Sequence, residues 1–332
     1  MLHRPRPLLP GAPIAVVAPA SAPRTLSVYE DGLAELRETY DVRMAWGPGA
    51  ERGYLAAPDA DRAGALQRAI DDDAIRAIVC VRGGYGCLRL LPHLHWDRAR
   101  THPTLLVGYS DVTALHLALY AQAGWPALSG PVATEWAQAD ATTLRSFRDW
   151  CEGNGPAAVT ARFEASPQPL VSGTATGPLL GGNLAVLTRL LGTPYAPSFD
   201  GALLVLEEVA EAPYRVDRML AHLDHAGVLD AVAGVALGRF TTGASPPDPP
   251  TLSLDEVFED YFADRPYPVV RDVPYGHCLP RCTVPLGVPG RLHATTHSAS
   301  LTAESVVASL YRNVISNVRI DSDVDKACKG TR

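Results

Sequence analysis

The sequence lacks both a long apolar run and a block of basic residues. No stretch reaches the roughly 18 consecutive apolar residues of a membrane-spanning helix, so we expect no transmembrane segment. The first 13 residues contain four prolines in place of the continuous apolar region of a signal peptide. The net charge of −7, with no cluster of Lys or Arg, argues against nucleic acid as a partner. We therefore expect a cytoplasmic protein that binds neither membranes nor nucleic acids.

Cysteine is sparse, with six residues scattered over 332 positions. Disulfide-stabilised domains are short and dense in cysteine, so a disulfide scaffold is excluded. Cys278 and Cys282 lie close to His277, which leaves a metal site as an alternative. Pro280 interrupts that segment and no second pair of ligands follows, whereas a zinc site needs three or four convergent ligands. We predict that the protein holds no metal.

The sequence also lacks the common nucleotide-binding motifs. Residues 82–86 read Arg-Gly-Gly-Tyr-Gly after an apolar run, which is not the G-x-G-x-x-G spacing of a dinucleotide fingerprint. No phosphate-binding loop is present either, and we expect no organic cofactor. Glycines at such a position let the backbone approach a ligand and direct N–H groups at an anion. The alternative is a plain turn between a strand and a helix.

What the chain does have is hydrophobic residues, at 47%, and enough length for two domains. Its first half alternates apolar runs with amphipathic stretches, which predicts a parallel sheet covered by helices. The strands are expected at 14–18, 77–81 and 105–108, and the helices at 27–38, 59–71 and 112–123. We predict an α/β protein with a Rossmann-like N-terminal domain over residues 1–155.

Residues 156–176 are rich in Gly, Pro and Ser and read as a linker. A smaller C-terminal α/β domain is expected over 177–320, and a polar tail over 321–332. Within this second domain we expect helices at 184–191 and from Pro213 onward, and strands at 202–206, 232–237 and 284–288.

Ser110 follows the predicted strand 105–108 and precedes a helix. A serine at this corner presents its hydroxyl at a helix N-terminus, where free N–H groups favour a developing oxyanion. The geometry is analogous to a nucleophile elbow, although the sequence is not G-x-S-x-G. The alternative is a helix N-cap, which is the usual role of serine in this position.

An acid and a histidine in the second half are candidate partners for this serine. Glu207 ends an apolar strand, and a carboxylate there can hold a histidine in one tautomer. His277 lies in a turn between two strand-like runs and is a plausible base. The alternative for the Glu207–Glu208–Glu211 group is a solvated cluster of acids at the start of a helix.

Seven segments, in order, together resemble the LD-carboxypeptidase family of serine peptidases. They are VRGGYGCLRLLPHL from Val81, LVGYSDVTALHLAL from Leu106, SGPV from Ser129, GGNLAVLTRLLGTPY from Gly181, LLVLEEVAEAPYRVDRMLAHL from Leu203, GVALGRF from Gly234 and VPYGHCLPRCTVPLGV from Val273. Each segment is weak alone, but the ordered set spans about residues 10 to 315.

The resemblance implies a catalytic triad of Ser110, Glu207 and His277 at the junction of the two domains. It also implies an oxyanion hole made by the backbone N–H groups of Asp111 and Gly84. The triad chemistry needs no cofactor.

An LD-carboxypeptidase substrate ends in a carboxylate, which an arginine fork binds well. Arg82, Tyr85 and Arg215 are our candidates for substrate binding; pairing of the arginines with nearby acids is the alternative. We also expect a homodimer.

The resemblance leaves two substrates open. In the muropeptide branch of the family the enzyme cuts the bond to the terminal D-alanine of a peptidoglycan tetrapeptide, and we favour this reading. In the microcin C self-immunity branch it cleaves a peptidyl or aminoacyl nucleotide mimic. A non-catalytic ligand-binding protein on the same fold is the alternative from another functional class.

Overall fold

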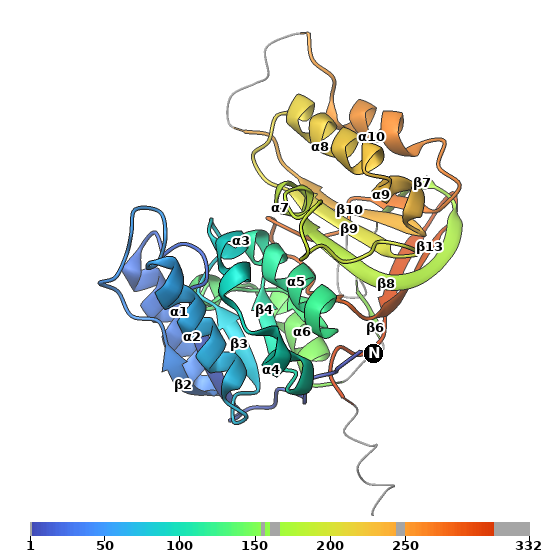
Figure 1. Ribbon diagram of the computed structural model, residues 1–332. Coiled ribbons are helices and arrows are strands. Elements are labelled where there is room, and N and C mark those ends of the chain that lie inside the picture. Colours follow the sequence, from blue (N-terminus) through green and yellow to red (C-terminus); the bar gives the residue numbers. More distant parts are fainter. Residues whose placement is uncertain (1, 154–156, 160–166, 244–249, 309–332) are drawn as a thin grey trace, which may run out of the picture.

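The computed structural model describes residues 2–153, 157–159, 167–243 and 250–308, which form a six-stranded and an eight-stranded sheet with helices packed on them (Figure 1). The first sheet is built mainly from the N-terminal half of the chain and the second from the C-terminal half. The predicted α/β class is confirmed. No described helix is long and apolar enough to cross a bilayer.

The N-terminal sheet has the strand order β12-β5-β4-β3-β1-β2, and its first five strands along the chain run parallel. These strands are β1 (Pro13–Val17), β2 (Asp41–Ala45), β3 (Ala77–Cys80), β4 (Leu105–Gly108) and β5 (Ala127–Ser129). The predicted strand over 105–108 has the bounds of β4. The carboxyl ends of β1, β3 and β4, which are neighbours in the sheet, lie along one edge.

Helices cover both faces of this sheet, as its continuous apolar strands predict. Ala15 and Val17 of β1 belong to the core beneath α2 and α5, while Ile14 and Val16 belong to the core beneath α1 and α6. These helices are α1 (Leu26–Thr39), α2 (Asp59–Asp71), α5 (Thr113–Ala123) and α6 (Ala141–Cys151), with the short α3 (Cys87–Leu90) and α4 (Trp96–Thr101) beside α2 and α5.

The C-terminal sheet has the order β6-β14-β13-β8-β9-β10-β11-β7. Its central strands β8 (Gly173–Asn183), β9 (Leu203–Glu208), β10 (Gly234–Phe240) and β11 (Val269–Arg271) are parallel. The outer strands β6 (Ala157–Ala158), β7 (Gln168–Val171), β13 (Pro289–Ala294) and β14 (Ala299–Ala303) are antiparallel to their neighbours. The helices of this part are α7 (Leu184–Thr188), α8 (Pro213–His225), α9 (Val228–Ala231) and α10 (Leu254–Phe262).

Two segments differ from the prediction. The expected linker 156–176 contains β6, β7 and the start of β8. Pro169 does not prevent strand formation in β7, because β7 lies at the edge of the sheet where a missing N–H is tolerated. The strand expected at 284–288 in the second domain is β12 (Val284–Leu286), and it joins the N-terminal sheet antiparallel to β5. The predicted tail 321–332 lies outside the described residues.

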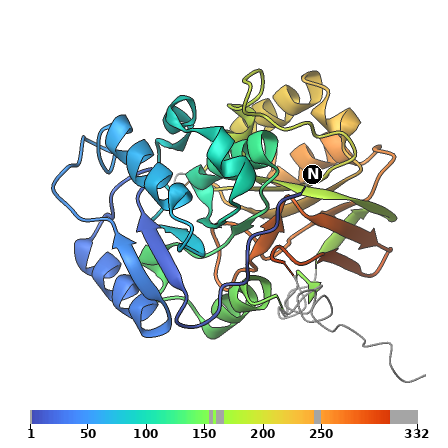
Figure 2. The ribbon, with the colours of Figure 1, turned by 60° about the horizontal axis from the view of Figure 1, so that its bottom comes forward.

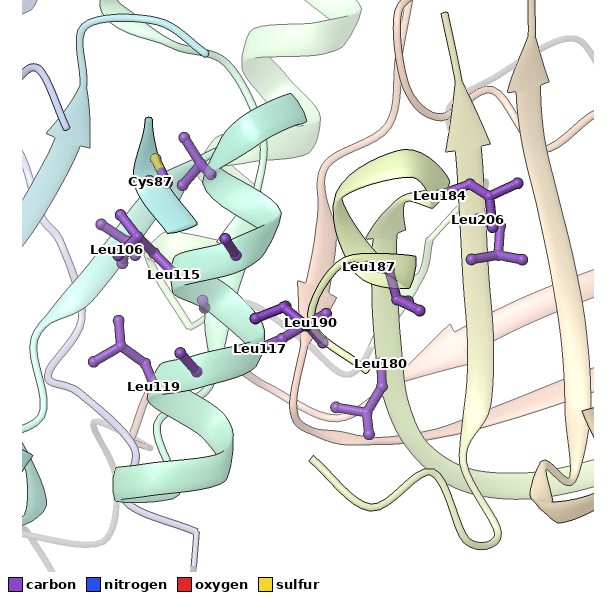
Figure 3. Packing of buried hydrophobic residues seen from close by; sticks show 14 of the residues in the cluster. Cys87, Leu106, Leu115, Leu117, Leu119, Leu180, Leu184, Leu187, Leu190 and Leu206 are labelled. Atoms are coloured by element: carbon purple, nitrogen blue, oxygen red, sulfur yellow. The ribbon is translucent and has the colours of Figure 1, made fainter. Parts of the chain in front are cut away.

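The two sheets share one apolar core at their boundary. Leu117 of α5 lies beside Leu190, which follows α7, and both belong to the same buried cluster (Figure 3). The N-terminal segment also runs along this boundary (Figure 2), where Pro5 accepts a hydrogen bond from the backbone of Ala308 at 2.8 Å. Side chains of the N-terminal half are thereby held in fixed positions relative to those of the C-terminal half.

Candidate active site

Ser110 stands at the turn between β4 and α5, in a backbone conformation that is uncommon for serine. Its φ of 63° lies in the left-handed region, which costs a non-glycine residue energy. Ser110 is the first residue of a short 3-10 helix (Ser110–Val112), and the N-cap position of α5 is Val112. The serine therefore does not cap α5, and it lines a cavity at the end of the strand.

The glycine loop after β3 packs directly against this serine. A Cβ atom on Gly83 would lie 2.8 Å from the Cβ of Ser110, so no larger residue fits there. Gly84 has a φ of +115°, and a Cβ on it would lie 2.5 Å from the Oγ of Ser21. Both glycines line the same cavity as Ser110. The close approach leaves backbone N–H groups, rather than side chains, as the donors available at this wall.

The Asp111 carboxylate turns away from this cavity and fixes the glycine loop from behind. It accepts a hydrogen bond from the backbone N–H of Cys87 at 2.8 Å. Burial raises the pKa of the Asp111 carboxyl above its usual range. Within Asp111, it is therefore the backbone N–H and not the side chain that remains a candidate donor to an oxyanion.

The cavity has a volume of about 760 Å³ and is bounded by both halves of the chain. Its lining includes Arg24, Arg82, Gly83, Gly84, Ser110 and His277. Segments that are remote in the sequence thus meet here, as expected for the carboxyl edge of a parallel sheet.

Glu207 and His277 form a hydrogen-bonded pair at the C-terminal side of the cavity. The Nδ1 atom of His277 lies 2.7 Å from Oε2 of Glu207, and the Glu207 side chain is almost wholly buried. Gly276 makes room for this carboxylate, because a Cβ at its φ of +101° would lie 2.6 Å from Oε2 of Glu207. When Nδ1–H donates to the carboxylate, the Nε2 atom is left as an acceptor.

Glu208, next in the chain, shares the Asn183 amide with Glu207 but has otherwise different partners. Its carboxylate accepts hydrogen bonds from Asn183 Nδ2 at 2.9 Å, from the N–H of Ala185 at 2.7 Å and from the N–H of Val209 at 2.9 Å. Burial raises its pKa. Both glutamates are buried, so the alternative of a solvated acid cluster does not hold for these two residues.

A partly buried charged cluster, which the sequence did not indicate, lies behind His277. Arg281 pairs with the Glu135 carboxylate through two nitrogens, and its guanidinium carbon lies 4.0 Å from the ring centre of Tyr109. The Tyr109 hydroxyl donates to Glu135 at 2.5 Å, and its ring centre is 4.9 Å from that of His277. Tyr109 precedes Ser110, so this cluster joins the histidine loop to the serine turn.

The predicted substrate-binding residues separate in space. Arg82 lines the cavity. Tyr85 is 49% exposed and packs edge-on against Tyr54, with ring centres 5.3 Å apart. Arg215 lies on α8, pairs with Glu211 at 3.2 Å and is not among the lining residues.

Arg24 also lines the cavity, although we did not predict it as a substrate-binding residue. The signal was its place in the loop after β1, at the same strand edge as the serine.

Cys278 and Cys282 do not belong to a ligand cluster. Cys282 is fully buried, whereas Cys278 is partly exposed. Among the described residues no group of three or more His, Cys, Asp or Glu side chains is arranged to hold a metal ion.

Comparison with known proteins identifies the family. The model of the LD-carboxypeptidase N-terminal domain matches residues 14–130, and that of the LD-carboxypeptidase C-terminal domain matches residues 176–292. A putative carboxypeptidase of Streptomyces coelicolor is 41% identical over 308 residues, which cover 90% of this chain and 96% of that protein. The chain belongs to the LD-carboxypeptidase family. It is therefore a peptidase, and thus a hydrolase, by family.

Other relatives carry more specific names. The murein tetrapeptide carboxypeptidase of Pseudomonas aeruginosa is 34% identical, over 80% of this chain and 87% of that protein. The crystal structure of a muramoyltetrapeptide carboxypeptidase from Oxalobacter formigenes matches with a TM-score of 0.80 and 26% identity, over 90% of this chain and all of that one. A microcin C7 self-immunity protein in complex with aspartyl sulfamoyl adenosine has a TM-score of 0.81 at 22% identity, over 92% and 100% of the two chains, a likeness of fold alone.

Proposed function

We propose that this LD-carboxypeptidase is a serine enzyme in which Ser110 is the nucleophile, His277 the general base and Glu207 the residue that orients the histidine. The observation that carries the proposal is the Glu207–His277 hydrogen bond of 2.7 Å, formed at a cavity that a strained serine also lines. A base oriented by a carboxylate and set near a serine is the arrangement that nucleophilic acyl transfer needs.

The reaction takes place in two halves. The Ser110 Oγ attacks the carbonyl carbon of the substrate amide while Nε2 of His277 takes the hydroxyl proton. The carbonyl oxygen becomes an oxyanion, for which the backbone N–H groups of Gly84 and Asp111 are the proposed donors. The C–N bond then breaks, and His277 returns the proton to the leaving amine.

Water completes the cycle. His277 takes a proton from a water molecule, the resulting hydroxide attacks the acyl carbon, and the Ser110 oxygen leaves with the proton that His277 held. Glu207, buried and bonded to Nδ1, stabilises the imidazolium that forms in each half. No metal or organic cofactor takes part in these steps.

For the substrate we propose the tetrapeptide of peptidoglycan, cut between an L-centre and the terminal D-alanine. The names of the relatives from Pseudomonas and Oxalobacter support this choice. We propose that the enzyme acts in the cytoplasm on recycled cell-wall fragments. We also propose that it assembles as a homodimer. The alternative substrate, a nucleotide mimic of the microcin type, is supported only by a likeness of fold.

The test begins with covalent labelling. The enzyme is incubated with a fluorophosphonate and its mass is measured; we expect one adduct, on Ser110, and none in Ser110→Ala. Hydrolysis of the tetrapeptide by Ser110→Ala should fall by about 10³-fold or more, because the attacking atom is gone. An unlabelled protein that binds the peptide without cutting it would instead be a binding protein. Cleavage of aminoacyl sulfamoyl adenosine in place of the tetrapeptide would favour the microcin branch.

A further inference from the structure

Two arginines reach the cavity from neighbouring strands of the N-terminal sheet. Arg24 lies in the loop after β1 and Arg82 lies two residues after β3, and these strands pair in parallel from Ile14–Ala77 to Val17–Cys80. Because their carboxyl ends lie side by side, both loops open onto the same edge of the sheet as Ser110.

Neither guanidinium is neutralised within the described part of the chain. Among the described residues, Arg82 donates only to the backbone carbonyl of Ala22, at 3.3 Å, and neither Arg82 nor Arg24 forms an ion pair. Burial and the nearby charge of Arg24 hold the pKa of Arg82 below its usual range. The lining carboxylate of Glu135 is already bound to Arg281. Two like charges thus face one cavity without a counter-charge, and an anionic ligand would relieve their repulsion.

Arg82 also lies close to the point where the amide would be cut. Its Nη2 atom is 3.5 Å from the position that a Cβ would take on Gly84, and the Gly84 N–H is the proposed oxyanion donor. In a terminal amino acid, the carboxylate carbon lies about 2.5 Å from the amide nitrogen, two bonds away. The carboxylate of the leaving residue, two bonds from the cut amide nitrogen, is therefore the anion that we place beside Arg82.

We propose that Arg24 and Arg82 form the subsite that binds the free carboxylate of the leaving amino acid and so limits cleavage to the last peptide bond. This inference rests on the proposed function. Arg82 supplies the partly buried contact next to the glycine loop, and the exposed Arg24 adds charge at the mouth of the cavity. A substrate that continues beyond the cut bond would present a neutral amide to these two cations.

The experiment compares kcat/KM for the tetrapeptide acid with kcat/KM for its C-terminal amide. We expect the wild-type enzyme to prefer the acid by about 10- to 100-fold, the value of a hydrogen bond to a charged group. Arg82→Ala should abolish most of this preference. Arg24→Ala should reduce it by about 2- to 5-fold, since an exposed charge contributes less. Arg82→Lys keeps the charge but not the two-pronged guanidinium, and it should retain part of the preference for the acid. This variant replaces Arg82→Ala in the test if Arg82→Ala does not fold.

Arg89→Ala is the matched control. Arg89 borders the same glycine loop, but its guanidinium is paired with Asp59 and does not line the cavity. This variant should keep the wild-type acid-to-amide ratio. A wild-type enzyme that cuts acid and amide equally well would overturn the carboxylate subsite while leaving the proposed function standing. An enzyme that cuts neither peptide would instead contradict the proposed function.

Discussion

The last two residues of β9, Glu207 and Glu208, are both buried but face different partners. Both accept a hydrogen bond from the Asn183 amide. Glu207 also bonds to His277, whereas Glu208 accepts backbone N–H groups from Ala185 in α7 and from Val209 just after β9. A substitution of the same kind at each residue therefore separates a chemical role from a structural one.

We expect Glu207→Gln to lower kcat for the tetrapeptide by about 10³- to 10⁴-fold, because the amide no longer holds the tautomer that leaves Nε2 as a base. Its melting temperature should change little in comparison. Glu208→Gln sets an amide N–H₂ against a backbone donor, and should cost about 1–3 kcal/mol of unfolding free energy while kcat falls less than about tenfold. Steady-state kinetics and thermal melts of the two variants provide the check. Equal, mild losses of kcat in both would assign the orienting acid to another residue.

The sequence predicted some of these residues better than others. Ser110 lies just after β4, Glu207 lies near the end of β9 and His277 lies in the loop after β11, and these local features together with the ordered family segments made them candidates. Arg215 does not line the cavity, and its guanidinium instead pairs with Glu211, one helical turn away. The Arg281–Glu135 pair joins positions 146 residues apart, and no local pattern indicates such a contact.

At the scale of elements, the loop between β11 and β12 is tied to the N-terminal half by the Arg281–Glu135 pair. Arg281 is 3% exposed, so removing its carboxylate leaves a buried charge without compensation. Burial acts to raise the pKa of Glu135, but the Arg281 guanidinium, together with hydrogen bonds from Tyr109 and Val132, holds that pKa below its usual range. The contribution of a carboxyl with a lowered pKa is present above its unfolded pKa and is lost as the pH falls through its folded pKa.

We expect Glu135→Gln to lower the unfolding free energy at pH 7 by about 3–5 kcal/mol. The difference from the wild type should shrink once the pH falls below the ordinary range of a glutamate carboxyl and passes through the lowered pKa of Glu135, because Glu135 of the wild type then becomes protonated. Denaturant unfolding at pH 7 and at low pH measures it. Glu211→Gln, which breaks the exposed pair with Arg215, is the control and should cost less than about 1 kcal/mol at either pH. If the unfolding free energies of Glu135→Gln and the wild type differed by the same amount across the pH range, the Arg281–Glu135 ion pair would not be the source of the stabilisation.

Elements differ in how far the sequence revealed them. The helix predicted over 59–71 is α2, because its apolar spacing is regular and long. Strand β12 has only three residues, and its apolar character fits either sheet. Its partner is β5, which lies more than 150 residues earlier in the chain and offers a free edge of the N-terminal sheet. Periodicity thus identifies an element but not the sheet that it joins.

At the scale of the whole molecule, the two sheets are joined by several independent contacts. Strand β12 returns to the N-terminal sheet, the helices α5 and α7 share a buried apolar cluster, and the N-terminal segment bonds to residues after β14 (Figures 1 and 3). Asn183, at the end of β8, also donates its N–H to Thr113 Oγ1 at 3.0 Å, next to the serine turn. The proposed site depends on these contacts, since Ser110 and His277 come from different halves.

We therefore expect the chain to unfold in a single calorimetric transition, with equal calorimetric and van't Hoff enthalpies, although chains of this length often unfold in parts. Leu187→Ala, in the shared cluster, should lower the midpoint of that one transition by an amount corresponding to about 2–5 kcal/mol. Leu252→Ala is the control, because Leu252 is 44% exposed and should leave the midpoint nearly unchanged. Activity and the heat signal should be lost over the same temperature range, because separating the halves parts Ser110 from His277. Two resolved transitions, with activity lost in the first, would instead show that each half is stable separately. The contacts between the halves would then hold the site together without stabilising either half.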